Sequence, residues 1–349
     1  MPLEYTTTRT NPGVDPVLTA WPLHVPIDLF AAAVAAGLMV LAGLHLLTAR
    51  PTRPQPMVTC TVGPFLGVIL LSIGLTALFF DLSHRLYVWR LYLTFEVTSP
   101  MSWGSYLMLF SYGALCVNII AHLPQSAPVL IRRYPVLGKF SELVFAQPSR
   151  VIALGVVNLG LGFALGIYTG TLLSTLRARP LWNSPLLGPL FLISGLAAAA
   201  ALLHAVLVLS SKPEHSIAKR PSWFDRLARQ TGGSKPDASL APMLRWAVVT
   251  FLTLQLVVIG LYLLGMVSGP NVGQRASTIL FAGPYALPFW VLVVGVGTAV
   301  PLVLQLLETG RKVRPMAFSA LLVLIGAFAL RVILVYAGQE SHWIRVAGG

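Results

Sequence analysis

Residues 60–80 read CTVGPFLGVILLSIGLTALFF, an apolar run without a charged side chain. A helix of about 20 residues spans roughly 30 Å, which is the thickness of the hydrocarbon core of a bilayer. The run ends at a long polar connection that contains Asp81, Arg85 and Glu96, and a second apolar run follows it. This pattern predicts two transmembrane helices joined by a charged loop.

The composition of the whole chain agrees with a membrane protein. Of its 349 residues, 56% are hydrophobic and only 10% are charged, whereas soluble domains carry about 25% charged residues. Windows of about 20 apolar residues lie near 27–47, 60–80, 102–121, 150–172, 186–210, 242–267, 284–306 and 316–337. The sequence therefore predicts an all-α integral membrane protein with eight transmembrane helices, arranged as two four-helix bundles.

Lys and Arg exceed Asp and Glu by 13, an excess that in a soluble chain would suggest nucleic acid. Here the loops after the first, third, fifth and seventh helices, with their flanks, hold 16 Lys and Arg, and the remaining loops with both tails hold 7. Positively charged loops stay in the cytoplasm. The asymmetry predicts that both termini and the loop after residue 80 face outward, and it explains the excess without nucleic acid.

These assignments divide the chain into two predicted helical bundles, with polar segments between and around them. The longest basic loop is interpreted as solvated, with a lipid-associated surface helix as the alternative. The expected parts are an outer N-terminal arm at 1–26, a first bundle at 27–172, an outer connection at 173–185, a second bundle at 186–337 with the basic loop at 211–241, and an outer C-terminal tail at 338–349.

Polar groups of the first four predicted helices collect near their outer ends. Asp28 lies at the outer end of the first helix and Asp81 at that of the second, with His84 and Arg85 just beyond, while Tyr168 lies near the outer end of the fourth. Ionisable groups near hydrocarbon are costly and usually face the bundle or a wet cavity. We therefore expect these groups to converge at one depth.

The fourth predicted helix also carries Gly162, Gly166 and Gly170 at intervals of four. Such a stripe of small residues permits close contact between helices. Tyr168 lies on a different face of that helix, where its phenol either donates a hydrogen bond to a carbonyl in an apolar pocket or belongs to the aromatic belt of the outer interface. The stripe predicts helix packing rather than a site.

Metal and haem are not expected in this chain. Cys60 and Cys116 are too few for an iron–sulfur cluster, which takes four thiolates, and they have no metal-binding spacing. A haem would need two of His45, His122 and His204 as facing axial ligands, and these histidines show no recurring pair within a helix. Asn118, Asn158, Gln255 and Gln305 lie inside spans, where isolated amides either join helices or line a proton path.

Two separated motifs carry a family resemblance. Residues 97–104 read VTSPMSWG, residues 179–183 read RPLWN, and the tail at 330–332 and 337–339 fits as well. Together with the eight helices, the chain resembles the NrfD/PsrC family, the quinone-reactive membrane subunits of polysulfide reductase and related molybdopterin complexes. The resemblance covers nearly the whole chain.

The resemblance implies a quinone pocket, for menaquinone or ubiquinone, on the outer side of the first four helices. The matching residues are Asp28, Asp81 and Tyr168, with Arg85 close behind Asp81. Because the polysulfide reductase subunit has a histidine where this protein has Asp28, His24 one turn earlier is the alternative helix-one ligand. Asp28, Asp81 and Tyr168 are the expected catalytic groups, since an acid and a phenol can donate or relay protons.

The resemblance also implies partners and a place in the cell. An iron–sulfur subunit is expected to dock on the outer loop and to connect the pocket to a molybdopterin oxidoreductase subunit, in a prokaryotic inner membrane. The residues expected at that docking surface are His84, Arg85, Arg90, Thr98, Ser99 and Trp103. A secondary transporter and a membrane cytochrome with haem b are the alternative functions.

Overall fold

The computed structural model describes residues 21–48, 57–82, 84–176, 178–210, 240–310 and 317–341. In these ranges the polypeptide forms helices, and eight helical segments are long and apolar enough to cross a membrane. The predicted fold class is therefore confirmed. The basic loop and most of both predicted terminal segments lie outside the described residues.

The spanning segments agree with the predicted windows to within a few residues, except where a helix continues past the apolar run. They are α1 (His24–Thr48), η1 with α2 (Val58–Val62 and Gly63–Asp81), α4 (Pro100–Ser126), α7 (Pro148–Ser174), α8 (Leu187–Ser210), α10 (Leu240–Val267), α12 with η3 and α13 (Ala286–Pro288, Phe289–Ala299 and Val300–Thr309) and α14 (Phe318–Glu340). Proline at the first helical position starts α4 and α7, where its missing N–H costs nothing.

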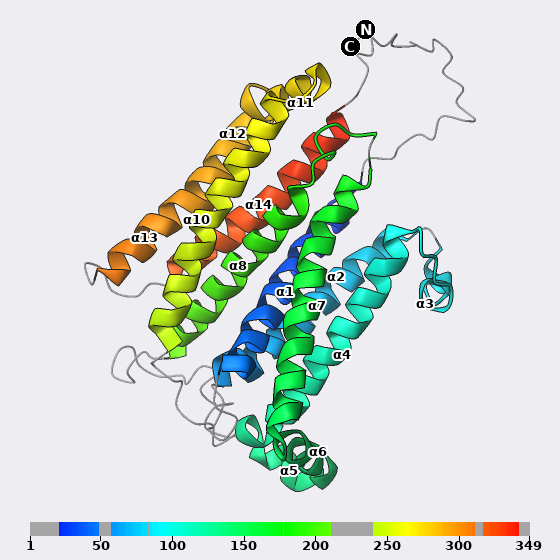
Figure 1. Cartoon of the computed structure of the whole chain (residues 1–349), viewed down its shortest axis with the longest axis vertical. Helices are drawn as coiled ribbons and strands as arrows, with labels where there is room; N and C mark the ends of the chain where they lie inside the picture. Colours follow the sequence, from blue (N-terminus) through cyan, green and yellow to red (C-terminus); the bar gives the residue numbers. More distant parts are fainter. Residues whose placement is uncertain are drawn as a thin grey trace.

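Short helices lie at both ends of the spanning segments. Those at the end where α1 begins and α14 ends, called the upper end, are η2 (Arg85–Tyr87), α3 (Arg90–Leu93) and α11 (Asn271–Phe281). Those at the opposite, lower end are α5 (Pro128–Arg133) and α6 (Pro135–Phe145). In Figure 1, α3 projects at the right-hand side of the view, beyond α2 and α4, and α5 with α6 lie at the bottom, below α4 and α7.

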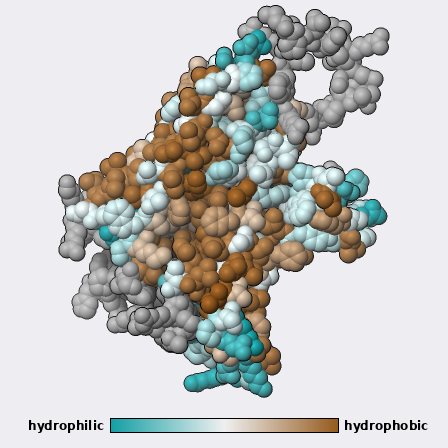
Figure 2. Space-filling view, viewed as in Figure 1, coloured by the Kyte–Doolittle hydropathy of each residue, from teal (hydrophilic) through white to brown (hydrophobic). Residues whose placement is uncertain are grey.

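The first helix lies at the centre of the molecule. It packs against α2 and α7 on one side and against α8 and α14 on the other, and its alanine-rich middle is almost wholly buried. Apolar side chains form most of the visible flank between more polar ends (Figure 2). That distribution is expected of a protein whose flank faces hydrocarbon.

The glycine stripe of α7 packs as the sequence predicts. A β-carbon on Gly162 would lie 2.8 Å from the carbonyl oxygen of Ala36 in α1, and one on Gly170 would overlap the backbone of Leu187 at the start of α8. Backbones this close exclude any larger residue. The stripe therefore fixes α7 against both α1 and α8.

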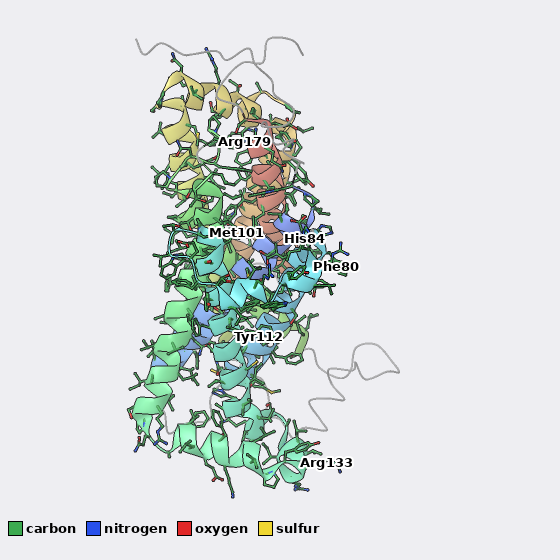
Figure 3. The ribbon with its side chains drawn as sticks, turned by 90° about the vertical axis from the view of Figure 1, so that its right-hand side faces the viewer. Phe80, His84, Met101, Tyr112, Arg133 and Arg179 are labelled. Atoms are coloured by element: carbon green, nitrogen blue, oxygen red, sulfur yellow. The ribbon has the colours of Figure 1, made fainter. Side chains whose placement is uncertain are left out.

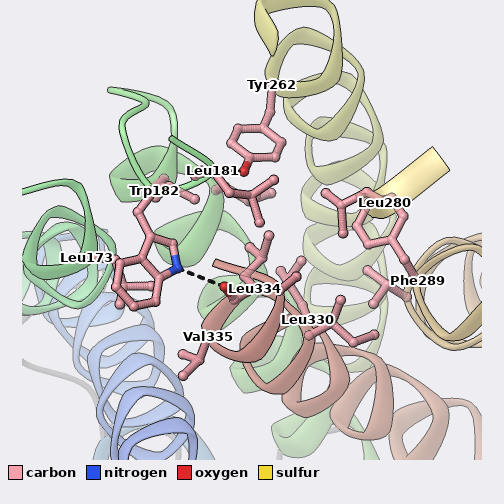
Figure 4. Close-up of a cluster of buried hydrophobic side chains, with 14 of the residues drawn as sticks. Leu173, Leu181, Trp182, Tyr262, Leu280, Phe289, Leu330, Leu334 and Val335 are labelled. Atoms are coloured by element: carbon pink, nitrogen blue, oxygen red, sulfur yellow. Dashed lines mark hydrogen bonds between the residues drawn. The ribbon is translucent and has the colours of Figure 1, made fainter. Parts of the chain in front are cut away.

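The connection between α7 and α8 is bound into the second half of the protein. The indole of Trp182 donates a hydrogen bond to the carbonyl of Leu334 at 2.8 Å, as Figure 4 shows, and it stacks on Trp21 with ring centroids 5.3 Å apart. The hydroxyl of Tyr262 donates to the carbonyl of Leu181 at 2.7 Å. These contacts join the connection between α7 and α8 to α14, to α10 and to the segment before α1.

Candidate functional site

Asp28 lies on the second turn of α1 and is buried. Its carboxyl group faces Gly74 of α2, where a β-carbon would lie only 2.6 Å from Oδ1 of Asp28. Any side chain at position 74 would displace the carboxyl group. The glycine thus provides the space that holds an acid inside the bundle.

Tyr168 reaches from α7 across to α4. Its phenol lies over Gly104 so closely that a β-carbon there would overlap the hydroxyl. The side chain is half-buried and close enough to Asp28 for an electrostatic interaction between the two groups. Gly74 and Gly104 therefore leave room for an acid from α1 and a phenol from α7 that are close enough to interact electrostatically.

His24 lies one turn before Asp28, at the first residue of α1. Residues four apart share a helix face, and the buried Nδ1 of His24 has no hydrogen-bond partner among the described residues. We call His24, Asp28 and Tyr168, with the two glycines beneath them, the acid–phenol pocket. It is assembled by α1, α2, α4 and α7, the four helices that the sequence singles out.

Asp81 lies at a different depth in the bundle from Asp28, so the expectation that these polar groups converge at one depth is wrong. It is the last residue of α2 and is exposed, seven residues beyond the glycine that Asp28 contacts, which corresponds to about 10 Å along a helix. Asp81 lines a cavity of about 570 Å³ at the upper end. The other lining residues are Phe80, Leu82, His84, Arg85, Leu86 and Tyr87.

Arg85 closes one side of this cavity by turning back onto α2. Its Nη2 donates to the carbonyl oxygen of Phe80 at 2.9 Å, and its guanidinium lies 5.5 Å from the centroid of the Phe80 ring. The contact satisfies a carbonyl that the end of the helix leaves without an intrahelical partner. Arg85 thereby holds a positive charge next to Asp81 and His84.

The loop between α2 and α4 is ordered by its own polar contacts. Glu96 accepts hydrogen bonds from the hydroxyl of Thr98 at 2.8 Å and from the backbone N–H of the same residue at 3.3 Å. These bonds hold the pKa of the Glu96 carboxyl below its usual value. The indole of Trp103 donates to the carbonyl of Val97 at 2.9 Å, and Ser99 precedes the first residue of α4.

The same loop exposes large side chains at the upper end. Arg90 lies 4.7 Å from the centroid of the Tyr87 ring, and the loop's exposed apolar residues include Leu86, Tyr87, Trp89, Leu93, Phe95 and Val97. Figure 3 shows Phe80, His84 and Met101 at similar heights, above Tyr112. The cavity around Asp81 thus lies beside an exposed surface that mixes charged and aromatic groups.

Arg331 is the residue whose role the sequence does not predict. It lies in the middle of α14 and is fully buried, and its guanidinium donates to the carbonyl oxygens of Leu29, Phe191 and Ala327 and to the hydroxyl of Ser194, at 2.6 to 3.2 Å. A charged residue within an apolar span is the signal that could have identified it. The bond to Leu29 places this cation next to the backbone of α1, at the residue that follows Asp28.

The histidines near the lower end separate into two groups. His204 of α8 places Nε2 at 3.2 Å from Oε1 of Glu308, which Arg245 also approaches at 3.1 Å. His122 of α4 lies with Nδ1 at 2.9 Å from the carbonyl of Asn118 and near His45 of α1. Among the described residues, no group of three or more His, Cys, Asp or Glu side chains could hold a metal ion.

The fold and the pocket define a multi-pass membrane protein with an acid and a phenol at one end of its first four helices. The family model described as Polysulphide reductase, NrfD, matches residues 14–220 and 225–341. The protein belongs to this family, as its motifs predict. It is accordingly a membrane subunit of a redox complex.

Three relatives match nearly the whole sequence. It is 29% identical over 331 residues to the C subunit of polysulfide reductase from Wolinella succinogenes, with 93% of this protein and 95% of that subunit covered. It is 27% identical over 332 residues to protein NrfD of Escherichia coli, covering 91% and 95%, and 26% identical over 325 residues to a protein NrfD homolog of Haemophilus influenzae, covering 91% and 94%.

Proposed function

We propose that this protein is the quinone-reactive membrane subunit of a multi-subunit oxidoreductase. It exchanges electrons between a menaquinone or ubiquinone pool and an iron–sulfur subunit, which serves a molybdopterin-type catalytic subunit. The observation that carries the proposal is the position of Asp28 and Tyr168, which are close enough for an electrostatic interaction and lie with His24, whose buried Nδ1 has no partner among the described residues, at the upper end of the first four helices.

The side chains present suit the two oxygens of a quinone. A quinone that binds there takes up two electrons and two protons. The hydroxyl of Tyr168 can donate a hydrogen bond to a carbonyl oxygen, and His24 and Asp28 can donate or hold a proton beside it. In this proposal Asp81, which lines the exposed cavity at the upper end, relays protons between water and the groups around the quinone.

The exposed loop supports docking of the electron-carrying partner. Arg85, Arg90 and the ionised Glu96 give it both signs of charge, and its aromatic side chains are the type enriched at protein interfaces. In this proposal the clusters and the molybdenum belong to the partners, and the upper end is the outer face of a prokaryotic inner membrane. The 16-to-7 distribution of loop Lys and Arg supports that orientation.

Replacing Asp28 with asparagine tests the proposal, because the change keeps the shape of the group and removes its acidity. We expect Asp28→Asn to lower quinone-linked electron flow in the intact complex by roughly 100-fold or more, while dye-linked activity of the catalytic subunit is unchanged. Glu142→Gln, an exposed acid at the lower end, is the matched control. Wild-type quinone kinetics in Asp28→Asn would contradict the proposal.

A further inference from the structure

A groove of about 780 Å³ lies between α4 and α7. The two helices are neighbours (Figure 1), and the lining includes small residues of both, namely Ala114, Ala153 and Gly160. A β-carbon on Gly160 would meet no atom of the described residues within 4 Å. Unlike Gly162 and Gly170 on the same helix, this glycine is not required for helix packing, and it leaves room on the outside of the bundle.

Large apolar side chains that line the groove are exposed on the flank of the protein. Phe110 of α4 is 59% exposed and Val156 of α7 is 54% exposed. The flank of a spanning bundle contacts the acyl chains of the bilayer and not water. Hydrocarbon chains therefore fill a groove of this size and lining.

The groove extends over about half of the membrane. Along α7 its lining runs from Arg150 to Leu161, which at 1.5 Å per residue is about 16 Å, and one leaflet contributes about 15 Å of hydrocarbon. Leu161 lies about 10 Å from Tyr168 along the helix, toward the lower end, so the groove ends before the acid–phenol pocket. These dimensions suit an acyl chain of the lower leaflet, whereas a spanning helix of another subunit needs a groove across the whole bilayer.

Arg150 places a positive charge at the lower end of the groove. Its Nη1 donates to the carbonyl oxygen of Leu143 at 2.6 Å, which fixes the guanidinium where α6 ends and α7 begins. A guanidinium has five N–H donors, and among the described residues the side chain of Arg150 makes no other hydrogen bond and no ion pair. Its remaining donors can bind an anion.

The headgroup determines which lipid this groove prefers. Lipid tails are as apolar as the lining side chains, so an acyl chain gains little by leaving the bilayer for the groove. A phosphate at the height of Arg150 gains charge-assisted hydrogen bonds. Residues 128–150 carry four Lys or Arg and one Glu, and a basic surface of this kind favours a lipid with a net negative charge over a zwitterionic one.

We propose that the groove between α4 and α7 is a binding site for an anionic phospholipid. One acyl chain lies in the groove, and the phosphate binds the guanidinium of Arg150. The site is separate from the acid–phenol pocket, and the proposal does not depend on the quinone reaction.

Photolabelling of the intact, delipidated complex in detergent tests the site. The probes are a phosphatidylglycerol with a diazirine in one acyl chain and the phosphatidylcholine with the same chains, and labelled peptides are mapped by mass spectrometry. We expect phosphatidylglycerol to label the segments 109–117 and 150–161 about tenfold or more over phosphatidylcholine, as charge-assisted hydrogen bonds imply. Equal labelling by the two lipids would show ordinary boundary lipid and overturn the proposal.

Substitutions separate the contribution of the charge from that of the groove. Arg150→Gln should bring the labelling ratio close to one, and Arg150→Lys should keep part of the preference. Gly160→Leu should reduce labelling of the groove by both lipids, because its side chain occupies the groove. Co-purification of the catalytic subunit and elution in size-exclusion chromatography report assembly of each variant.

Two matched variants lie away from the groove. Gly260→Leu alters an exposed glycine of α10 where a β-carbon also meets nothing within 4 Å among the described residues, and Arg133→Gln removes an exposed charge of α5. Both should label as the unmodified protein does. An unchanged lipid preference in Arg150→Gln would overturn the proposal. Labelling that added menaquinone displaces and added phosphatidylglycerol does not would assign the groove to a quinone tail and overturn it as well.

Discussion

The contact between Gly104 and Tyr168 can be altered by substituting either residue. Tyr168→Phe removes only the hydroxyl, and Gly104→Ala adds a methyl group where that hydroxyl now lies. If the phenol donates a neutral hydrogen bond to quinone, its loss costs about 0.5–1.5 kcal/mol, which corresponds to a roughly 2- to 13-fold weaker apparent affinity. Gly104→Ala should cost at least as much, because it displaces the ring as well.

Gly113 provides a matched control on the same helix. A β-carbon there would meet nothing within 4 Å, so Gly113→Ala should leave quinone kinetics unchanged. In both positions alanine favours the helix by up to about 1 kcal/mol over glycine. A loss confined to Gly104→Ala therefore reports the clash with Tyr168 and not a weakened helix.

The assay is quinone-linked electron flow in the intact complex as a function of quinone concentration, with dye-linked activity measured alongside. We expect Tyr168→Phe and Gly104→Ala to raise the apparent KM for quinone, and the double variant to cost less than the sum of the two, since both changes remove one interaction. An unchanged KM in Gly104→Ala would refute the assignment of the phenol to the pocket.

Three further predictions concern the upper end, the orientation and the cofactors. Asp81→Asn should reduce turnover, by about 10²- to 10⁴-fold for a proton relay, with little effect on apparent quinone affinity; a change in KM alone would contradict the relay. A reporter that is active only in the cytoplasm should be inactive when it is fused after residue 349 and active when it is fused at Lys235. The reverse result would overturn the predicted orientation. The purified protein should show no Soret band and no bound metal, and one haem per molecule would support the cytochrome alternative.

The hydropathy of the sequence was sufficient to predict the spanning helices. Apolar windows of bilayer length place the eight segments within a few residues, because any such segment must satisfy its backbone hydrogen bonds as a helix. The helix ends were less accurate where a proline sets the start, as at Pro100 and Pro148, or where polar residues continue the helix beyond the hydrocarbon, as at Ser126.

Most contacts between helices cannot be predicted from the sequence. Because a spanning helix is apolar on every side, its pattern does not define which face meets which neighbour. The sequence singles out Asp28 and Tyr168 as candidates, but it does not indicate that they pack against Gly74 and Gly104, since a glycine that accommodates another helix's side chain resembles any packing glycine. The two levels of Asp28 and Asp81 likewise depend on how far α1 and α2 are shifted along each other.

Arg331 connects the second four helices to the helix that carries the acid of the pocket. A guanidinium buried in an apolar span is tolerated only when its N–H groups find acceptors, and here they are supplied by α1, α8 and α14. The acceptor on α1 is the carbonyl of Leu29, so the bond fixes both the depth and the rotation of the helix at the residue after Asp28. The second half of the protein thereby helps to hold the acid of the pocket against Gly74 through a contact with the backbone of α1.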